Sequence, residues 1–151
     1  SEEVESELPL VSLEDLLWHR PFLRRALLTS YGVDYHYVGA MLRGSPADAN
    51  GEVIIVDHDP AHSRRRAGFD ATTHAQRLVV MPEFHAVDAT QLERSRMERG
   101  CMHSKLMLLA FDGGTAETRF LRVSISSANL GEYHAGVNNA YWVHDFAWTG
   151  E

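Results

Sequence analysis

The chain of 151 residues contains one cysteine, one lysine and no long hydrophobic run. The single cysteine, Cys101, cannot form an intramolecular disulfide or build a cysteine-based zinc site, which fits a reducing compartment. No stretch of about 18 apolar residues could cross a bilayer, and the first residues are acidic where a secretory signal would be basic. These absences predict a soluble, intracellular protein without a membrane partner.

The chain also has no excess of positive charge. Lysine and arginine total 14 and aspartate and glutamate total 21, which gives a net charge of -7. This balance excludes a protein that coats a polyanion through its overall charge, while a local phosphate site remains compatible with it. The length suits one hydrophobic core. We expect residues 1–11, which are rich in glutamate, to be a flexible segment and residues 12–151 to form a single domain.

The only lysine is Lys105, and the other 13 basic residues are arginine. Arginine can replace lysine on most solvated surfaces, whereas a compact ammonium on a flexible stem is harder to replace in a tight site. The isolated lysine is therefore either a chance survivor of a bias against lysine or a functional residue.

Helical patterns and short apolar segments alternate along the chain. We expect a first helix from Ser12 to about residue 30, kinked or split at Pro21, and a turn-rich loop over 44–51. The predicted strands are 33–42, 53–56, 78–81, 102–111, 119–126 and 140–146. Because the strand at 53–56 is apolar throughout, we expect both of its faces to be covered. This order predicts an α/β fold with a mixed sheet flanked by helices.

His103 and Lys105 open the segment 102–111. In an extended chain, alternate residues share a face and lie about 6 to 7 Å apart, so the imidazole and the ammonium point to the same side. Met107, Leu109 and Phe111 continue that face, and the other face is also apolar, which predicts an interior strand with a polar pair at its end. Burying a charge without a partner is costly, and a phosphate would supply that partner.

The segment 119–126 is expected to pair with 102–111 and to bring Ser127 and Asn129 beside the His-Lys pair. A serine hydroxyl and an asparagine amide are neutral donors suited to phosphate oxygens. Taken alone, these two residues are better explained as caps of the turn that follows. The joint presence of His-x-Lys and Ser-x-Asn favours a phosphate site.

His103-Ser104-Lys105, followed about two dozen residues later by Ser127-Ala128-Asn129-Leu130, resembles the signature of the phospholipase D superfamily in the version carried by tyrosyl-DNA phosphodiesterases. Most of the superfamily has an aspartate at the position of Ala110, which tyrosyl-DNA phosphodiesterases also lack. We expect Asp112 to be a turn residue. The resemblance extends over roughly residues 12–148 and covers one of the two halves of a full family member, which are related as a pseudo-twofold pair.

The resemblance implies a metal-independent phosphodiesterase, without a cofactor, that acts on a DNA 3′ end carrying a tyrosyl or other adduct. It implies that a neutral His103 attacks phosphorus and forms a covalent phosphohistidine. It also implies that Lys105 and Asn129, together with Ser127, hold the phosphate oxygens. A role in DNA repair and a nuclear location follow from the resemblance alone.

Full family members take a second histidine from a second His-x-Lys motif to protonate the leaving group and later activate water. No other histidine here has a lysine two residues on, because Lys105 is the only one. The chain is therefore half of a longer enzyme, pairs with a second copy of itself, or has lost turnover. We favour the half-enzyme. The alternatives are a self-associating single-motif nuclease or phospholipase-like enzyme and a catalytically silent module that binds phosphate or nucleic-acid ends.

Other candidates carry less weight. Asn138 and Asn139 lie near where the family places a further polar contact, although a gap is needed to align them. His58 and His62 have the spacing of a helical metal pair, but the proline between them indicates a loop, and we predict no metal site. The arginines at 64–66 are more simply a solvated loop than a nucleic-acid contact.

Overall fold

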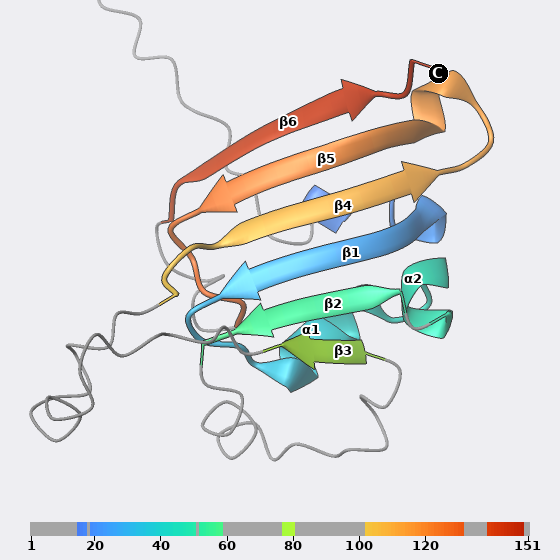
Figure 1. Cartoon of the computed structure of the whole chain (residues 1–151). Coiled ribbons are helices and arrows are strands. Elements are labelled where there is room, and N and C mark those ends of the chain that lie inside the picture. The colour runs from blue at the N-terminus through green and yellow to red at the C-terminus, as the bar shows by residue number, and fades with distance from the viewer. Residues whose placement is uncertain are drawn as a thin grey trace, which may run out of the picture.

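The computed structural model of the chain describes residues 15–17, 19–50, 52–58, 77–80, 102–131 and 139–149. Six strands form one mixed sheet in the order β3-β2-β1-β4-β5-β6 (Figure 1). They are β1 (Leu23–Ser30), β2 (Val53–Asp57), β3 (Arg77–Val80), β4 (Leu106–Asp112), β5 (Arg119–Ser126) and β6 (Tyr141–Ala147). The expected mixed sheet is confirmed, whereas the expected flexible segment 1–11 lies outside the described residues.

The direction of the strands decides which of their ends meet. β2 is parallel to β1 and to β3, whereas β4 is antiparallel to β1 and starts an antiparallel run through β5 and β6. The C-terminal ends of β1, β2 and β5 therefore lie at the same edge of the sheet as the N-terminal ends of β4 and β6 (Figure 1). We call this edge, made by residues 29–32, 57–58, 102–106, 126–130 and 139–141, the site edge.

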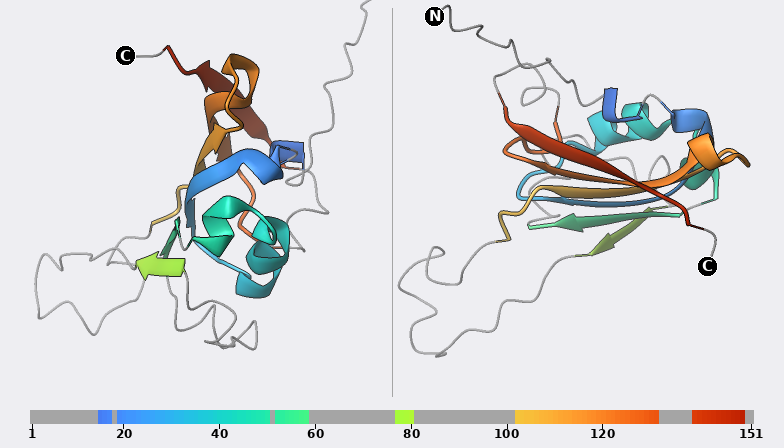
Figure 2. Two further views of the ribbon diagram at one scale, coloured as in Figure 1. Left: turned by 90° about the vertical axis from the view of Figure 1, so that its right-hand side faces the viewer. Right: turned by 90° about the horizontal axis from the view of Figure 1, so that it is seen from above.

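Short helices pack on one face of the sheet (Figure 2). They are the 3-10 helices η1 (Asp15–Leu17) and η2 (Arg20–Phe22) and the α-helices α1 (Tyr35–Leu42) and α2 (Pro46–Ala49), while η4 (Ala116–Thr118) lies between β4 and β5. The largest fully buried side chains of the core are Leu16, Leu17, Leu23, Leu28, Tyr35, Val38, Leu42, Val53, Ile55, Leu109 and Leu130. Among the described residues, no helix combines the length and apolar character needed to cross a membrane.

The predicted first helix is wrong, because much of it forms the central strand β1. Leu23 and Ala26 are buried while the two arginines between them are exposed, and the register with β4 shifts between Leu23 and Arg25. This irregularity puts two buried residues three positions apart, which imitates helical spacing. From Ala26 onward, Leu28 and Ser30 continue the buried face with the period of a strand.

The predicted strand over 33–42 is also wrong, because helix α1 occupies most of it. Its aromatic and branched residues suggested a strand, but Asp34 caps the helix by accepting a hydrogen bond from Tyr37 N at 3.0 Å. Tyr35 and Val38 are both fully buried, as residues three positions apart on one helical face would be. The cap and the buried face together decide in favour of a helix.

The predicted loop over 44–51 contains the short helix α2. Ser45 Oγ accepts a hydrogen bond from Asp48 N at 3.1 Å, and Pro46 stands at the first helical position, where its missing N–H costs nothing. The turn-forming residues predicted a loop, whereas Ser45 and Pro46 begin a helix.

The strand predicted at 53–56 is confirmed as β2, but the expectation that both faces are covered is wrong. Val53 and Ile55 are fully buried under the helices, whereas Ile54 is 37% exposed on the other face. Further apolar side chains of that face are exposed on β5 and β6, namely Leu121, Ile125, Trp142 and Phe146. In the described part of the chain, helices thus cover one face of the sheet.

The strand predicted over 102–111 begins only at Leu106 as β4, so the prediction is wrong for 102–105, where the Thr29 side chain bonds Ser104 O and Leu106 N in place of the β1 backbone. The other later strands follow the sequence predictions closely. The segment predicted at 119–126 is β5, its antiparallel pairing with β4 is confirmed, and β6 lies within one residue of its expected range. β3 matches its prediction up to Val80. Asp112, expected to be a turn residue, is the last residue of β4 and precedes the turn. Its Oδ1 accepts from Gly114 N at 3.0 Å and from Arg119 Nε at 3.1 Å, and these two contacts lower the pKa of its carboxyl.

Candidate active site

The segment 102–105 enters the site edge directly before β4 and is fixed there by both neighbouring strands. On the β1 side, Thr29 Oγ1 donates to Ser104 O at 3.0 Å and accepts from Leu106 N at 3.0 Å. On the β5 side, Ser126 N donates to Lys105 O at 3.0 Å. The backbone that carries the two predicted functional residues therefore has a defined position.

Lys105 and His103 contact each other at this edge. Lys105 Nζ lies 2.8 Å from Nδ1 and 3.0 Å from Nε2 of His103, and it donates to the His103 carbonyl at 3.0 Å. Lys105 is only 7% exposed, whereas His103 is exposed to solvent. The structure thus places a buried ammonium against an imidazole that a substrate in solution can reach.

Asn129 follows β5 and lies against the turn that follows β1. Its Oδ1 lies 3.4 Å from Ser30 Oγ, and a Cβ added at Gly32 would lie 3.9 Å from its Nδ2. Between these two residues is Tyr31, whose ring centroid lies 5.2 Å from that of His103. One short turn therefore touches both the Asn129 amide and the His103 imidazole, and it brings the two ends of the predicted motif to the same part of the edge.

Ser127 and Asn139 contact each other across the start of β6. Ser127 Oγ donates to Asn139 Oδ1 at 3.1 Å and accepts from Ala140 N at 3.0 Å. Ser127 is exposed, so its hydroxyl both joins β5 to β6 and faces solvent at the site edge. Asn138, the other asparagine considered above, lies outside the described residues.

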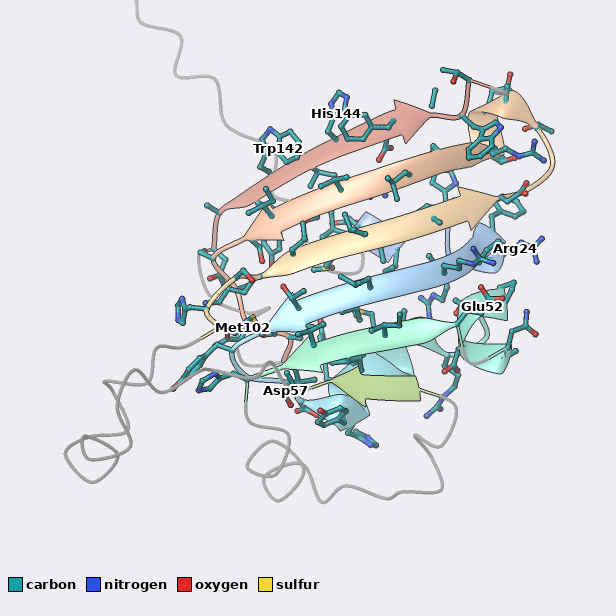
Figure 3. The ribbon with its side chains drawn as sticks, viewed as in Figure 1. Arg24, Glu52, Asp57, Met102, Trp142 and His144 are labelled. Atoms are coloured by element: carbon teal, nitrogen blue, oxygen red, sulfur yellow. The ribbon has the colours of Figure 1, made fainter. Side chains whose placement is uncertain are left out.

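A buried polar pair supports the edge from the helix side. Tyr35 Oη donates to Asp57 Oδ2 at 2.7 Å, and both residues have no exposed surface. Because Tyr35 opens α1 and Asp57 closes β2, this hydrogen bond fixes the helix to the strand end beside the site. Asp57 and Met102 lie at the same end of the sheet (Figure 3).

Two residues near His103 were missed as site residues in the sequence. The rings of Tyr31 and His58 stack with centroids 4.8 Å apart and an interplanar angle of 19°. His58 Nδ1 also accepts from Met102 N at 3.3 Å. The sequence suggested His58 only as a partner of His62, which lies outside the described residues. The available signal was that His58 directly follows the buried strand β2, as Tyr31 follows β1.

A phosphate ester is the ligand that this arrangement suits best. The ammonium can hold a phosphate oxygen, the amide of Asn129 can donate to another, and a neutral imidazole has a lone pair with which to attack phosphorus. The sheet, together with His-x-Lys and Ser-x-Asn at one edge, defines a protein of the phospholipase D type. More specifically, the sequence matches the tyrosyl-DNA phosphodiesterase family over residues 1–149, and the chain belongs to that family.

Crystal structures of the yeast tyrosyl-DNA phosphodiesterase are similar in fold. The enzyme itself has a TM-score of 0.55 and 14% identity, with 89% of this chain and 28% of that chain covered. A histidine-to-alanine mutant has a TM-score of 0.54 and 14% identity, with 88% of this chain and 27% of that chain covered. The chain thus spans about a quarter of the length of these solved chains. No curated protein matches the sequence.

Proposed function

We propose that the chain supplies the first half of a tyrosyl-DNA phosphodiesterase active site, in which His103 attacks the phosphorus of a DNA 3′-phosphotyrosyl diester. The observation that carries this proposal is the contact between the Lys105 ammonium and the solvent-exposed His103 imidazole. A general phosphate-binding surface would need positive charge, but it would not need an accessible imidazole beside the only lysine of the chain.

The chemistry follows from these two side chains and Asn129. As a ring nitrogen of His103 bonds to phosphorus, the bond to the tyrosyl oxygen breaks and negative charge builds on the non-bridging oxygens. Lys105 and Asn129 would stabilise that charge. A neutral imidazole has one lone pair, and in the structure the ammonium lies against the ring nitrogens. If a phosphate oxygen accepted the hydrogen bond of the Lys105 ammonium in place of the imidazole, the lone pair of His103 would be free for attack. The exposed Ser127 hydroxyl has one proton, which it donates to Asn139 Oδ1, so it would donate to the phosphate in exchange for that hydrogen bond.

Completion of the reaction needs a second acid and base. The departing tyrosyl oxygen must gain a proton, and the phosphohistidine must be attacked by an activated water. The 151 residues hold one His-x-Lys motif, because they hold one lysine. Without that acid, the tyrosyl oxygen can leave only as a phenolate that takes its proton from the solvent. We therefore expect the chain by itself to form a phosphohistidine slowly and to retain it, and we expect a second motif-bearing half to accelerate that step and to release the DNA 3′ end.

The test is to trap the covalent intermediate with a 3′-phosphotyrosyl oligonucleotide in excess chelator, followed by alkaline quenching and intact mass measurement. We expect a DNA adduct on the wild-type chain and none on the His103→Ala variant. His144→Ala is the matched control, since His144 is an exposed histidine in the middle of β6, and it should retain the adduct. An adduct that disappears with chelator, or that persists on His103→Ala, would contradict the proposal.

The single motif also favours a second candidate, a site completed by a second copy of the chain. Superfamily members with one motif can build a shared site in this way. Light scattering combined with turnover measurements separates the two candidates. Multiple turnover whose specific rate rises with chain concentration would support self-association, whereas multiple turnover by a strict monomer would exclude it.

A further inference from the structure

We propose that Tyr31 and His58 are positioning residues for His103. The Tyr31 ring supports the imidazole, and His58 anchors both that ring and the backbone that carries the imidazole. The inference rests on the proposed role of His103 as the nucleophile. It adds two residues that act through His103 and do not themselves contact the phosphate.

The pairing of two parallel strands sets the position of the Tyr31 and His58 rings. Ser30 and Asp57 are the last partners in the register of β1 and β2, and His58 N donates to Ser30 O at 3.3 Å. Tyr31 and His58 are thus the next residues on adjacent strands. Their rings stack at 4.8 Å with an angle of 19° between them. Backbone hydrogen bonds of the sheet therefore hold this ring pair, so the pair forms a rigid support.

His103 contacts that support through Tyr31. The two ring centroids lie 5.2 Å apart and the rings are tilted by 49°, which is within the range of favourable aromatic contacts. His103 is exposed and precedes β4, so without such a contact its side chain would exchange among rotamers. Contact with Tyr31 on one side and with Lys105 Nζ at 2.8 Å restricts the imidazole to one orientation.

His58 has a second connection to His103, through the backbone. Its Nδ1 accepts from Met102 N at 3.3 Å, and Met102 is the residue before His103. Because Nδ1 is the acceptor, the neutral ring carries its proton on Nε2. His58 is therefore connected to the His103 imidazole in two ways: its ring stacks on Tyr31, which contacts that imidazole, and its Nδ1 bonds the main chain before His103. A replacement at position 58 can remove either link separately.

Four variants separate the ring contacts from the hydrogen bond. Tyr31→Phe keeps the ring, and Tyr31→Leu removes it at a site that is 43% exposed, where the fold should tolerate the change. His58→Asn removes the ring but places an amide oxygen close to the position of Nδ1, whereas His58→Phe keeps a ring and loses the acceptor. Circular dichroism and thermal melting verify that each variant is folded.

The first measurement is nuclear magnetic resonance of the uniformly isotope-labelled chain and requires no activity. The ring protons of His103 should be shifted by the ring current of Tyr31 in the wild type and in Tyr31→Phe, and they should move toward the values of a free histidine in Tyr31→Leu. The Met102 amide proton should change in His58→Phe and stay near its wild-type position in His58→Asn. Identical His103 ring shifts in wild type and Tyr31→Leu would overturn the proposal.

The second measurement is the single-turnover rate of phosphohistidine formation as a function of oligonucleotide concentration. Misplacing a nucleophile by a fraction of an ångström to 1 Å is expected to lower the maximal rate by about 10- to 100-fold for Tyr31→Leu and for His58→Phe. The half-saturating concentration should stay within about twofold of wild type, because binding of the phosphate is not affected. A raised half-saturating concentration at an unchanged maximal rate would make these residues substrate contacts and would overturn the positioning role.

The two measurements also separate this inference from the proposed function. Ring shifts that follow Tyr31 as expected, on a wild-type chain that forms no adduct, would overturn the nucleophile assignment and leave the ring support established. Adduct formation at the wild-type rate in Tyr31→Leu and in both His58 variants would overturn the positioning role and leave the nucleophile assignment intact.

Discussion

At the residue scale, Lys105 combines burial with a charge. Its ammonium is almost fully enclosed, and it contacts the ring nitrogens and the carbonyl of His103. Neutral acceptors only partly replace the hydration of an ammonium, so an anion that enters at this edge would be stabilised by the charge. Phosphate oxygens meet that requirement, and their negative charge increases during attack.

Replacing Lys105 should therefore affect the rate much more than the fold. Lys105→Met keeps most of the apolar stem and removes the charge, and we expect phosphohistidine formation to slow by about 100- to 1,000-fold. The melting temperature should change little, because the methionine fills most of the space of the buried lysine stem. Quench-flow kinetics with thermal melting tests this pair of outcomes. Unchanged kinetics in Lys105→Met would show that the ammonium does not contact the phosphate.

His19 is a second residue whose surroundings have a measurable consequence. Burial among the Phe111 and Phe120 rings, with the nearby Arg122 guanidinium, lowers its pKa below the ordinary value of 6.5. The unfolded chain therefore takes up the His19 proton at a higher pH than the folded chain. The stability contributed by neutral His19 is complete above about pH 6.5 and is lost as the pH falls toward the lower folded pKa.

Urea unfolding at several pH values, compared between wild type and His19→Phe, tests this linkage. The phenylalanine keeps an aromatic ring in the same surroundings and cannot titrate. We expect the wild type to lose more stability than the variant between pH 7.5 and pH 5.5. If the free energy of unfolding changed equally with pH in the two proteins over this range, the lowered pKa of His19 would be contradicted.

The His103-Lys105 pair and the Tyr31-His58 pair differ in how far they could be predicted. Alternation along a strand predicted that His103 and Lys105 lie together, and the structure places them in contact, although both precede the strand β4. The stack of Tyr31 on His58 depends on the parallel register of two strands far apart in the sequence, which local patterns do not contain. Ser127 shows the same limit, because its partner Asn139 lies 12 residues further on, just before β6.

At the element scale, local competition explains the two wrong assignments. In β1 an irregularity of the register imitated helical spacing, and in α1 aromatic residues concealed a helix that begins with a good cap. The strands from β4 to β6 were easier to predict because alternation and turn residues agreed. Gly113 in the turn after β4 illustrates that agreement, since a Cβ there would lie 2.6 Å from Thr118 Oγ1.

The cap of α1 provides a direct test of that helix. Asp34→Ala removes the acceptor for Tyr37 N and should lower the free energy of unfolding by about 1 kcal/mol. Asp34→Asn keeps a capping oxygen and should change it much less. Equal losses in the two variants, measured by urea unfolding, would mean that the cap does not stabilise the helix.

Arg122 joins three elements and should matter more for stability than an exposed ion pair. Its guanidinium donates to both carboxylate oxygens of Asp145 on β6 at 2.7 and 2.6 Å, and to Leu16 O of η1 at 2.8 Å. The Arg122 side chain is 11% exposed, whereas Arg119, paired with Asp112, is 42% exposed. Charge-assisted hydrogen bonds of partly buried groups contribute more to stability than those at the surface.

Arg122→Met and Arg119→Met form a matched pair for this comparison. We expect Arg122→Met to lower the free energy of unfolding by about 2 to 3 kcal/mol, and Arg119→Met to lower it by less than about 1 kcal/mol. Urea unfolding of both variants at neutral pH measures the difference. Similar small losses would show that the guanidinium does not fasten η1 and β6 to β5.

At the scale of the whole molecule, the mixed sheet explains why residues far apart in the sequence share one edge. Parallel β1 and β2 end there, antiparallel β4 begins there, and β5 returns to it, so the segments bearing His58, His103 and Asn129 converge. The fold is that of the yeast tyrosyl-DNA phosphodiesterase over about a quarter of its length. A proposed second half would face this edge, where the imidazole is accessible.

The proposed attack of His103 on phosphorus can be isolated from the later steps of the reaction. The most direct measurement uses an oligonucleotide with a 3′-(4-nitrophenyl) phosphate, because nitrophenolate leaves without needing a proton and so requires only the half-site present here. We expect a burst of about one nitrophenolate per chain in excess chelator, followed by little turnover, with the DNA adduct mapped to His103. No burst from a folded wild-type chain, or an equal burst from His103→Ala, would contradict it.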